Sequence, residues 1–268
     1  MSEALFISSR QNPRVKALAK LREASARRET GRFLIEGLRE LERAFENNIK
    51  LHTLYFCESL FRGEAARHWV EGVRASGVET IPVMPEVFDK LSHREGPDGL
   101  LAEAAMWSTG LDRLSLSSTP FILVVEAVEK PGNLGALLRS ADAAGVEAVV
   151  VCDPVTDIFN PNVVRASQGV VFGLPVAVAD TPAVAAFLRE RDIRTLATTP
   201  AAEALLWEVS MTGPVAIVMG SEKDGLSDFW LSHADARIKI PLAGQSDSLN
   251  VAAAAVITLF EAVRQRQA

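Results

Sequence analysis

Runs of apolar residues alternate with amphipathic stretches along the second half of the chain. The apolar runs predict strands at FILVVEA, AVVVCD, LPVAVA, RTLATT, VAIVMG and ARIKIP. Helical spacing predicts helices between them, near residues 133–145, 160–168, 183–191 and 225–234, with a last helix from about Leu249 to Gln265. Continuous Val- and Ile-rich strands that alternate with helices are typical of a mostly parallel sheet with helices on both faces. We therefore predict an α/β fold whose ligands bind in the loops at the carboxyl ends of the strands.

The first hundred residues carry a shorter pattern of their own. It predicts a helix from about Pro13 to Arg28, a short strand at FLIEG, a helix at LRELERAFENN and a strand at LHTLYFC. The segment TGLDRLSLSSTP is rich in Ser, Thr, Gly and Pro, which is typical of a linker. The sequence therefore predicts a smaller N-terminal α/β domain over residues 1–108, a linker over 109–120 and a larger domain over 121–268.

Composition disfavours several broad classes of protein. With 48% hydrophobic residues, the 268-residue chain can bury a sizeable core, and disorder over most of its length is not expected. The apolar runs are shorter than the roughly 20 residues of a membrane helix, and the start of the chain has no secretory signal. Cys57 and Cys152 cannot form a disulfide framework, and the Cys and His residues lack zinc spacing. We expect a cytoplasmic protein with no membrane segment and no metal.

The common cofactor and hydrolase motifs are missing from the sequence. It contains no G-x-G-x-x-G after a strand, no G-x-x-x-x-G-K-S/T, no H-E-x-x-H and no G-x-S-x-G. The four histidines are scattered, and none lies in a strand-end loop of the predicted sheet. A dinucleotide-binding enzyme, a P-loop enzyme and a histidine-based hydrolase are therefore disfavoured.

Basic residues are concentrated near the N-terminus, although the whole chain carries a net charge of −6. Residues 10–32 contain eight Lys and Arg residues against two acidic ones, Glu23 and Glu29. A local patch of this density can neutralise several phosphates of a nucleic acid. The same pattern also fits a helix face that is merely solvated, so charge alone leaves both interpretations open.

The stretch EKPGNLGALLRSADAAG, residues 129–145, follows the first strand of the larger domain. The apolar stripe of its helix consists of Leu134, Leu137, Leu138 and Ala141. Arg139 lies about 140° around the helix from Leu134 and so points away from that stripe. Gly135, one turn earlier on the same flank, leaves room for a ligand to approach. The position of Arg139 suits contact with a ligand, but taken alone this stretch favours an arginine exposed to solvent.

A second loop, VMGSEKDGLS at residues 218–227, follows another buried strand. Gly220 at the end of that strand permits close approach by a ligand, and Glu222 and Gly225 follow in a tight loop. A turn that only reverses the chain uses the same glycines. This loop alone therefore does not decide between the two explanations.

A third loop, IPLAGQSDSLN at residues 240–250, leads into the Ala-rich last helix. A cap for that helix is expected from Ser246, Asp247 or Ser248. Capping leaves Gly244, Gln245 and Asn250 without a role, which favours a further task for this loop.

Together the three loops resemble motifs 1, 2 and 3 of the SpoU-type RNA 2′-O-ribose methyltransferases, in the SPOUT superfamily. The stretches that carry the resemblance are PGNLGALLRSADAAG, VMGSEKDGLS and IPLAGQSDSLNVAAAAVITLFEA, which follow strands in the order and spacing of the family. VVRASQGVVFGLPV, residues 163–176, is similar to a further R-A-S-x-G stretch of many members. NPRVKALAKLREASARRETGRFLIEG is similar to the start of the family's small RNA substrate-binding domain. The resemblance therefore covers nearly the whole chain.

The resemblance implies an active site and a cofactor site at named positions. The matching active-site residues are Asn133, Arg139, Glu222, Ser248 and Asn250. S-adenosylmethionine is expected at Gly220, Ile240, Leu242, Leu249 and Asn250, with Thr198 as a weaker candidate. RNA-binding residues are expected at Arg10, Arg14, Lys16, Lys20 and Arg165. The chain departs mildly from the family pattern, in ways that affect only the fine shape of the pocket, with Ser140, Leu242 and Ala252 where Thr, Met and Ser are frequent.

The resemblance also implies a deep C-terminal trefoil knot, a rare exception to the rule against threaded chains, and a homodimer with its active site near the interface. The implied reaction moves a methyl group from S-adenosylmethionine to a ribose 2′-hydroxyl of RNA. Family analogy makes Arg139 the general base, although a guanidinium normally stays protonated, so a phosphate clamp is the alternative role. Ribosomal RNA is the expected substrate because of the separate N-terminal domain. The alternatives are a tRNA 2′-O-methyltransferase and a non-catalytic RNA-binding or ribosome-assembly protein of the same fold.

Overall fold

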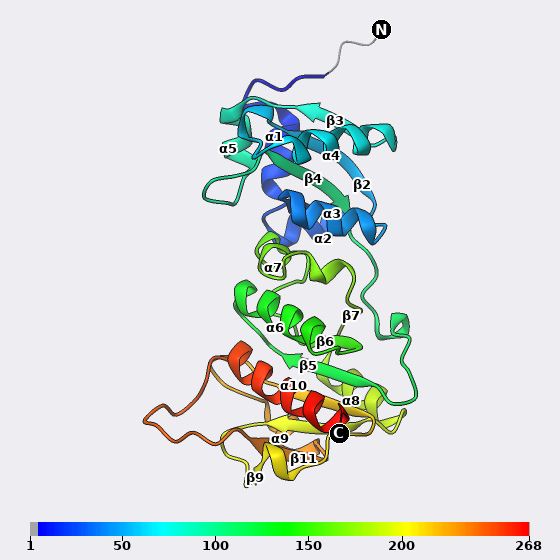
Figure 1. Cartoon of the computed structure of the whole chain (residues 1–268), viewed down its shortest axis with the longest axis vertical. Coiled ribbons are helices and arrows are strands. Elements are labelled where there is room, and N and C mark those ends of the chain that lie inside the picture. Colours follow the sequence, from blue (N-terminus) through cyan, green and yellow to red (C-terminus); the bar gives the residue numbers. More distant parts are fainter. Residues whose placement is uncertain (1–4, 268) are drawn as a thin grey trace. The chain divides into compact units, whose positions relative to one another are not determined.

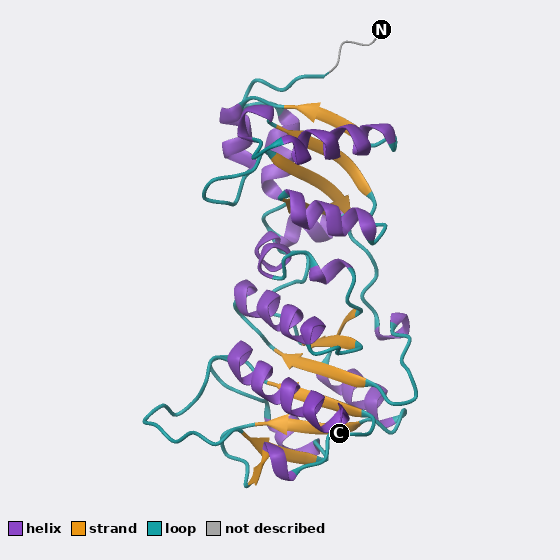
Figure 2. Cartoon of the chain, in the orientation of Figure 1, coloured by secondary structure: helices purple, strands orange, loops and turns teal. Residues whose placement is uncertain are grey.

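The computed structural model describes residues 5–267, which form two compact units (Figure 1). The first unit contains the described residues through Trp107 together with Asp157–Gly173. The second contains Ser108–Thr156 and the described residues from Leu174 onward. Both units mix helices and strands (Figure 2), so each can be described as an α/β structure.

A seven-stranded sheet forms the centre of the second unit. Its strands are β5 (Phe121–Glu126), β6 (Ala148–Cys152), β7 (Val176–Ala179), β8 (Arg194–Thr198), β9 (Ala204–Leu205), β10 (Val215–Met219) and β11 (Ala236–Lys239). They lie in the order β7-β6-β5-β10-β8-β11-β9, and every pairing is parallel. The chain runs outward from β5 to β7 and then crosses to the other side of β5, so the strand order reverses between β5 and β10. Ligands of open parallel sheets bind at such a switch point, outside the carboxyl ends of the strands.

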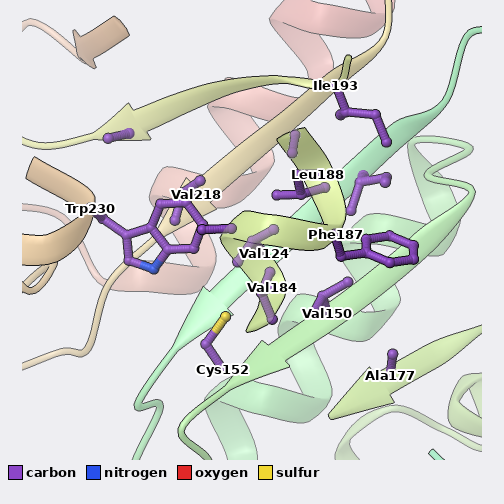
Figure 3. Close-up of a cluster of buried hydrophobic side chains, with 14 of the residues drawn as sticks. Val124, Val150, Cys152, Ala177, Val184, Phe187, Leu188, Ile193, Val218 and Trp230 are labelled. Carbon is purple, nitrogen blue, oxygen red and sulfur yellow. The ribbon is translucent and has the colours of Figure 1, made fainter. Parts of the chain in front are cut away.

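Both faces of this sheet are covered by helices. These helices are α6 (Pro131–Ala143), α8 (Thr181–Arg189), α9 (Asp228–His233) and α10 (Val251–Gln267). Val124, Val150 and Val218 lie on one face and pack with α8 and α9, and Figure 3 shows Trp230 of α9 within this cluster. Helices α6 and α10 contact each other and cover the opposite face (Figure 1). The predicted α/β fold with a mostly parallel sheet is confirmed, and the C-terminal knot stays a prediction.

The first unit is built around a four-stranded sheet. Its strands are β1 (Arg32–Glu36), β2 (Leu51–Phe56), β3 (Glu79–Pro82) and β4 (Leu100–Ala105). Its helices are α1 (Pro13–Lys20), α2 (Ala24–Thr30), α3 (Leu38–Glu46), α4 (Glu64–Ala75), α5 (Pro85–Leu91) and α7 (Pro161–Ala166). In the order β1-β4-β2-β3, β4 is antiparallel to both of its neighbours and β2 is parallel to β3. Leu34, Tyr55, Ile81 and Leu101 share one core with apolar side chains of α1 and α5.

The apolar pattern missed some elements that the structure contains. Strands β3, β4 and β9 and helices α4 and α5 were not predicted, whereas the six strands predicted for the larger domain are all present. Strand β4 has the sequence LLAEAA, and alanine and glutamate are depleted in strands generally. Pairing with β1 and β2 on both sides stabilises this strand in spite of its composition.

The single helix predicted over residues 13–28 is two helices, α1 and α2. Between them, Nη1 of Arg27 donates to the carbonyl oxygens of Leu21 and Arg22, at 2.8 and 2.7 Å. In a continuous helix, backbone N–H groups four residues further on would occupy those carbonyls. Arg27 is 1% exposed and forms an ion pair with Asp157. It is therefore a structural residue and does not belong to the exposed basic patch.

Residues 157–173 pack on the first unit, although they lie within the larger domain predicted over 121–268. Their aromatic side chains surround Trp107, whose ring centroid is 4.6 Å from that of Phe159 and 6.1 Å from that of Phe172. Edge-to-face aromatic pairs at such distances are favourable beyond their buried area. The first unit thus includes a segment that sequence-based boundaries place elsewhere.

The predicted linker over residues 109–120 packs against the second unit. The N–H of Val178 donates to the carbonyl of Thr109 at 2.7 Å, and Leu111, Leu114 and Leu116 pack against the buried cluster of Figure 3. The segment is therefore a connection with its own apolar contacts. Its leucines explain why a stretch rich in Ser and Thr is held in place.

Two general features bear on the predicted function classes. No helix within residues 5–267 is long and apolar enough to span a membrane. In the same described residues, His, Cys, Asp and Glu side chains do not gather in threes as metal ligands would.

Replacing Arg27 with alanine is expected to lower the free energy of unfolding by about 3 kcal/mol, because Asp157 and two carbonyl groups lose their buried donor. Urea unfolding followed by circular dichroism measures the change. The matched control is Arg28→Ala, since Arg28 is exposed on the same helix and its loss should cost less than about 0.5 kcal/mol. Equal stability of the two variants would contradict the structural role of Arg27.

Candidate active site

The loops after β8, β10 and β11 meet at one edge of the sheet, because parallel neighbours place their carboxyl ends side by side. A cavity of about 340 Å³ opens among these loops. Its walls come mainly from residues 198–200 and 219–226 and from residues between 240 and 254. This volume lies in the range of small-molecule sites in proteins.

The loop after β10 is a tight chain reversal. Ser221 and Gly225 exchange backbone hydrogen bonds with N···O distances of 2.9 and 3.2 Å, and φ of Gly225 is +72°. A Cβ on Gly220 would collide with the backbone of Gly225. Both glycines are therefore required by the loop's own fold. The same loop forms part of the cavity wall. It therefore both reverses the chain and lines the candidate ligand site.

One side chain from each of the three motif loops joins a hydrogen-bonded group next to the cavity. Asn133 Nδ2 donates to Glu222 Oε1 at 2.6 Å, and Asn250 Nδ2 donates to Asn133 Oδ1 at 3.4 Å. The backbone N–H of Glu129 donates to Glu222 Oε2 at 3.3 Å. Glu222 is itself part of the cavity wall. The structure thus brings together three of the five predicted active-site residues.

The Glu222 carboxylate is held in its charged form. Partial burial would raise its pKa, but the hydrogen bond from Asn133 and those from backbone N–H groups of Glu222, Glu129 and Lys130 outweigh burial and leave the pKa below its usual 4.5. A carboxyl group whose pKa is lower in the folded than in the unfolded chain stabilises the fold at any pH above its unfolded-state pKa. This stabilisation is lost as the pH falls through the folded-state pKa. At neutral pH Glu222 therefore acts as an acceptor that orients the amide of Asn133.

Asn250 caps the last helix. Its Oδ1 accepts from the N–H of Ala252 and its carbonyl from the N–H of Ala254, both at 2.9 Å. The helix begins at Val251, later than predicted. This observation corrects the expected caps, which are Ser246, Asp247 and Ser248. Asn250 therefore both caps α10 and contacts Asn133.

Most of the expected cofactor residues line the cavity. Those that do are Thr198, Gly220, Ile240, Leu242 and Leu249, joined by Ser248 of the active-site set. Asn250 is outside the lining and contacts Asn133 instead. The Oγ1 atom of Thr198 is buried and has no hydrogen-bond partner within the described residues. Since buried hydroxyls are normally paired, this atom points to a ligand as its partner.

Arg139 is exposed on α6, as its predicted angle from the apolar stripe requires. The stripe of Leu134, Leu137, Leu138 and Ala141 is buried as predicted. Arg139 takes no part in the hydrogen bonds that join Asn133 to Glu222 and Asn250. Gly135 is buried, so the expectation that it leaves open space for a ligand is wrong.

The predicted RNA-binding residues all lie on the surface of the first unit. They are Arg10, Arg14, Lys16, Lys20 and Arg165. Nη1 of Arg14 lies 3.1 Å from Glu79 Oε1, and this hydrogen bond raises the pKa of Arg14. Lys16 and Lys20 are one helical turn apart on α1 and share a face. Their contact with RNA stays a prediction.

Sequence reasoning missed several residues of the cavity. They are Thr199, Pro200, Met219, Leu226, Leu231, Val251 and Ala254. Thr199 and Pro200 directly follow β8, and the end of a predicted parallel strand was a signal that could have found them. Leu231 on α9 gave no such signal, because an apolar helical residue normally faces the core.

Comparison with known protein families agrees with this geometry. The model of the SpoU rRNA Methylase family matches residues 120–260, more than half of the chain. This chain belongs to the SpoU rRNA Methylase family. The model of an MRM3-like substrate binding domain matches residues 12–102. The SpoU match contains the three motif loops and all five predicted active-site residues.

Individual SpoU relatives resemble the chain over nearly its whole length. The 23S rRNA (guanosine(2553)-2′-O)-methyltransferase RlmP of Bacillus subtilis is 30% identical over 254 residues, which are 95% of this chain and 97% of that protein. A crystal structure of an RNA 2′-O ribose methyltransferase is 43% identical, with a TM-score of 0.86, and the match covers 98% of this chain and 100% of that one. The SpoU methyltransferase AviRb from Streptomyces viridochromogenes, in complex with the cofactor AdoMet, is 29% identical with a TM-score of 0.89 over 96% and 99% of the two chains.

The hydrogen bond from Asn133 to Glu222 in this SpoU protein is expected to persist from about pH 8 to about pH 5.5, because the pKa of Glu222 is lowered below 4.5. Nitrogen-15 NMR of the Asn133 side-chain amide measures it, and the resonance should move only at lower pH. The control is Glu222→Gln, which should shift the resonance by a pH-independent amount. A titration midpoint near neutral pH would contradict the charged state assigned to Glu222.

Proposed function

We propose that this SpoU protein transfers a methyl group from S-adenosylmethionine to a ribose 2′-hydroxyl of ribosomal RNA. The observation that carries the proposal is the cavity at the carboxyl ends of β8, β10 and β11, with Asn133, Glu222 and Asn250 hydrogen-bonded beside it. The reaction named for RlmP and the cofactor bound by AviRb support the same chemistry here. The match to a substrate binding domain supports binding of an RNA substrate by the first unit.

The residues of the cavity fit S-adenosylmethionine, which when bound supplies a methyl carbon attached to a positively charged sulfur. Leu242 and Leu249 line the cavity with 37% and 38% of their surface exposed, and an adenosine group would cover them. The unpartnered Oγ1 of Thr198 offers a hydrogen bond. Apolar walls with a few fixed polar groups are typical of cofactor sites.

Asn133 positions the ribose in this proposal. One N–H of its amide donates to Glu222 and its Oδ1 accepts from Asn250. An asparagine amide carries two N–H donors, so one donor is left for a hydroxyl of the substrate. Because Glu222 and Asn250 fix both ends of the amide, that donor has a defined direction.

Arg139 acts as a fixed cation in this proposal. A guanidinium keeps its proton in proteins, so a role as general base is disfavoured on physical grounds. Its planar fork suits a phosphate next to the reacting ribose. A cation there also stabilises the negative charge that develops on the 2′-oxygen as its proton passes to solvent water. The exposed position of Arg139 keeps it accessible to RNA.

The homodimer and the cytoplasmic location are part of the same proposal. Three apolar side chains of α10 stand exposed in the single chain, with exposed fractions of 40% for Val256, 42% for Ile257 and 46% for Phe260. Exposed apolar side chains gathered on one helix support an interface there. Sedimentation of the purified chain measures its oligomeric state, and a mass equal to one chain would contradict the dimer.

Arg139→Ala is expected to lower the rate of methyl transfer at least about 100-fold, because the developing charge loses its stabilising cation. The affinity for S-adenosylmethionine should change less than about twofold, since Arg139 is outside the cavity lining. Transfer of a labelled methyl group to unmodified ribosomal RNA gives the rate, and calorimetry gives the affinity. The control is Arg189→Ala, an exposed arginine on α8.

Three outcomes of this experiment would change the proposal. Full activity of the Arg139→Ala variant would contradict the role assigned to Arg139. If the unaltered protein neither binds S-adenosylmethionine nor methylates ribosomal RNA, the proposed function itself is wrong. Transfer to tRNA alone would replace the proposed substrate and leave the reaction type standing.

Charge reversal on α1 is expected to weaken RNA binding and to flatten its salt dependence. The double variant Lys16→Glu, Lys20→Glu removes two cations on one exposed face, so the slope of log K against log salt should decrease by about 2. The control is Arg39→Glu on α3, a helix outside the apolar core that α1 shares with α5. Filter binding at several salt concentrations measures both slopes. If α1 and the control behave alike, the patch is merely solvated.

A further inference from the structure

A buried carboxylate lies at the same edge of the sheet, and none of the roles above uses it. Glu126 is the last residue of β5 and is 4% exposed. Burying a carboxylate costs free energy unless its oxygens are paired or hydrogen-bonded. The partners of Glu126 therefore indicate what it holds in place.

Three hydrogen bonds converge on Glu126, two of them from one residue. Ser227 donates its backbone N–H to Oε2 at 2.8 Å and its hydroxyl to Oε1 at 2.7 Å. Thr181, the first residue of α8, donates its hydroxyl to Oε1 at 3.1 Å. A carboxylate only accepts hydrogen bonds, so it matches all three donors. An amide in its place would either turn its N–H group toward the N–H of Ser227 or require both hydroxyls to change from donors to acceptors.

Glu126 lies in largely buried surroundings, although its partner Ser227 is exposed. Cys152 ends β6 in register with Glu126, and burial raises the pKa of the Cys152 thiol to about 12. Thr181 is also 4% exposed. Hydrogen bonds to a charged acceptor in such an environment are stronger than at the surface, and losing one of them costs more.

Ser227 ends the loop that forms one wall of the cavity. Its neighbour Leu226 is 7% exposed and lines the cavity. Ser227 occupies the N-cap position of α9, but its side chain makes no cap bond to that helix. Its hydroxyl donates to Glu126. The loop is therefore fixed at its end by Glu126 and in its middle by the bond between Asn133 and Glu222.

We propose that Glu126 is a positioning residue for the cofactor cavity: by holding Ser227 it fixes the wall formed by residues 220–226 and the place of Glu222 opposite Asn133. The inference rests on the proposed function, because S-adenosylmethionine is the ligand assigned to the cavity there. Glu126 touches neither that ligand nor RNA in this role. It acts through the loop alone.

Glu126→Gln in the full chain is expected to raise the dissociation constant for S-adenosylmethionine at least about tenfold, because the loop loses part of its anchor. The KM for RNA should rise less than this dissociation constant, since the basic residues of the first unit are untouched and only the contact through Asn133 is disturbed. Calorimetry and steady-state kinetics measure the two effects. A positioning role raises the dissociation constant for S-adenosylmethionine more than the KM for RNA. A general loss of folded protein would lower the reaction rate and leave both constants unchanged.

Two further variants remove single donors from the same carboxylate. Ser227→Ala deletes one of the two loop bonds and should weaken S-adenosylmethionine binding by about threefold. Thr181→Val deletes the bond from α8 and leaves both loop bonds intact, so binding should change less than about twofold. If Glu126 only stabilises the end of the sheet, Thr181→Val and Ser227→Ala would instead have equal effects on binding.

The outcomes distinguish this inference from the function on which it rests. Unaltered protein that binds S-adenosylmethionine, together with Glu126→Gln and Ser227→Ala variants that bind it as tightly, overturns the role of Glu126 alone. Unaltered protein that does not bind S-adenosylmethionine overturns the proposed function and this inference with it. If Glu126→Gln does not fold, the comparison of Ser227→Ala with Thr181→Val decides.

Discussion

The parallel pairing of β5 with β10 is the constraint on which the site depends. Val125 pairs with Met219, so both strands end at the same level and their following loops begin side by side. This register brings Asn133 within 2.6 Å of Glu222, although 89 residues separate them along the chain. A slip of one residue would turn alternate side chains to the other face and would take Glu126 away from Ser227.

Two carboxylates at this edge of the sheet each accept hydrogen bonds from another element, one in partly exposed and one in buried surroundings. Glu222 is partly exposed and receives Asn133, while Glu126 is buried and receives Ser227. Each is an acceptor for donors on a different element, so each fixes a distance between elements. At Glu222 the partners on both oxygens are N–H donors, so a neutral amide there would turn its own N–H group toward another donor. The site therefore uses negative charge to hold backbone and amide groups still, and its candidate cation, Arg139, is exposed and takes no part in these hydrogen bonds.

The apolar pattern predicted the larger fold well because strands buried on both faces read as continuous Val and Ile runs. It failed where a distant contact decides local structure. The carbonyls at the break between α1 and α2 are satisfied by Arg27, which Asp157 holds from 130 residues away. The active-site residues could be predicted only from the family resemblance, because the position of Arg139 by itself fits an arginine exposed to solvent. Glu126 gave no signal because its partners lie far along the chain.

The boundary between the two matched domains is not a boundary of folding. The SpoU match covers residues 120–260, yet Asp157–Gly173 within it packs on the first unit. Phe159 and Phe172 are 5% and 8% exposed, and both contact the ring of Trp107. A chain cut at the predicted linker would uncover these rings and leave Asp157 without Arg27. The chain therefore crosses between the units three times, after Trp107, before Asp157 and after Gly173, and the segment that carries Arg165 belongs structurally to the unit expected to bind RNA.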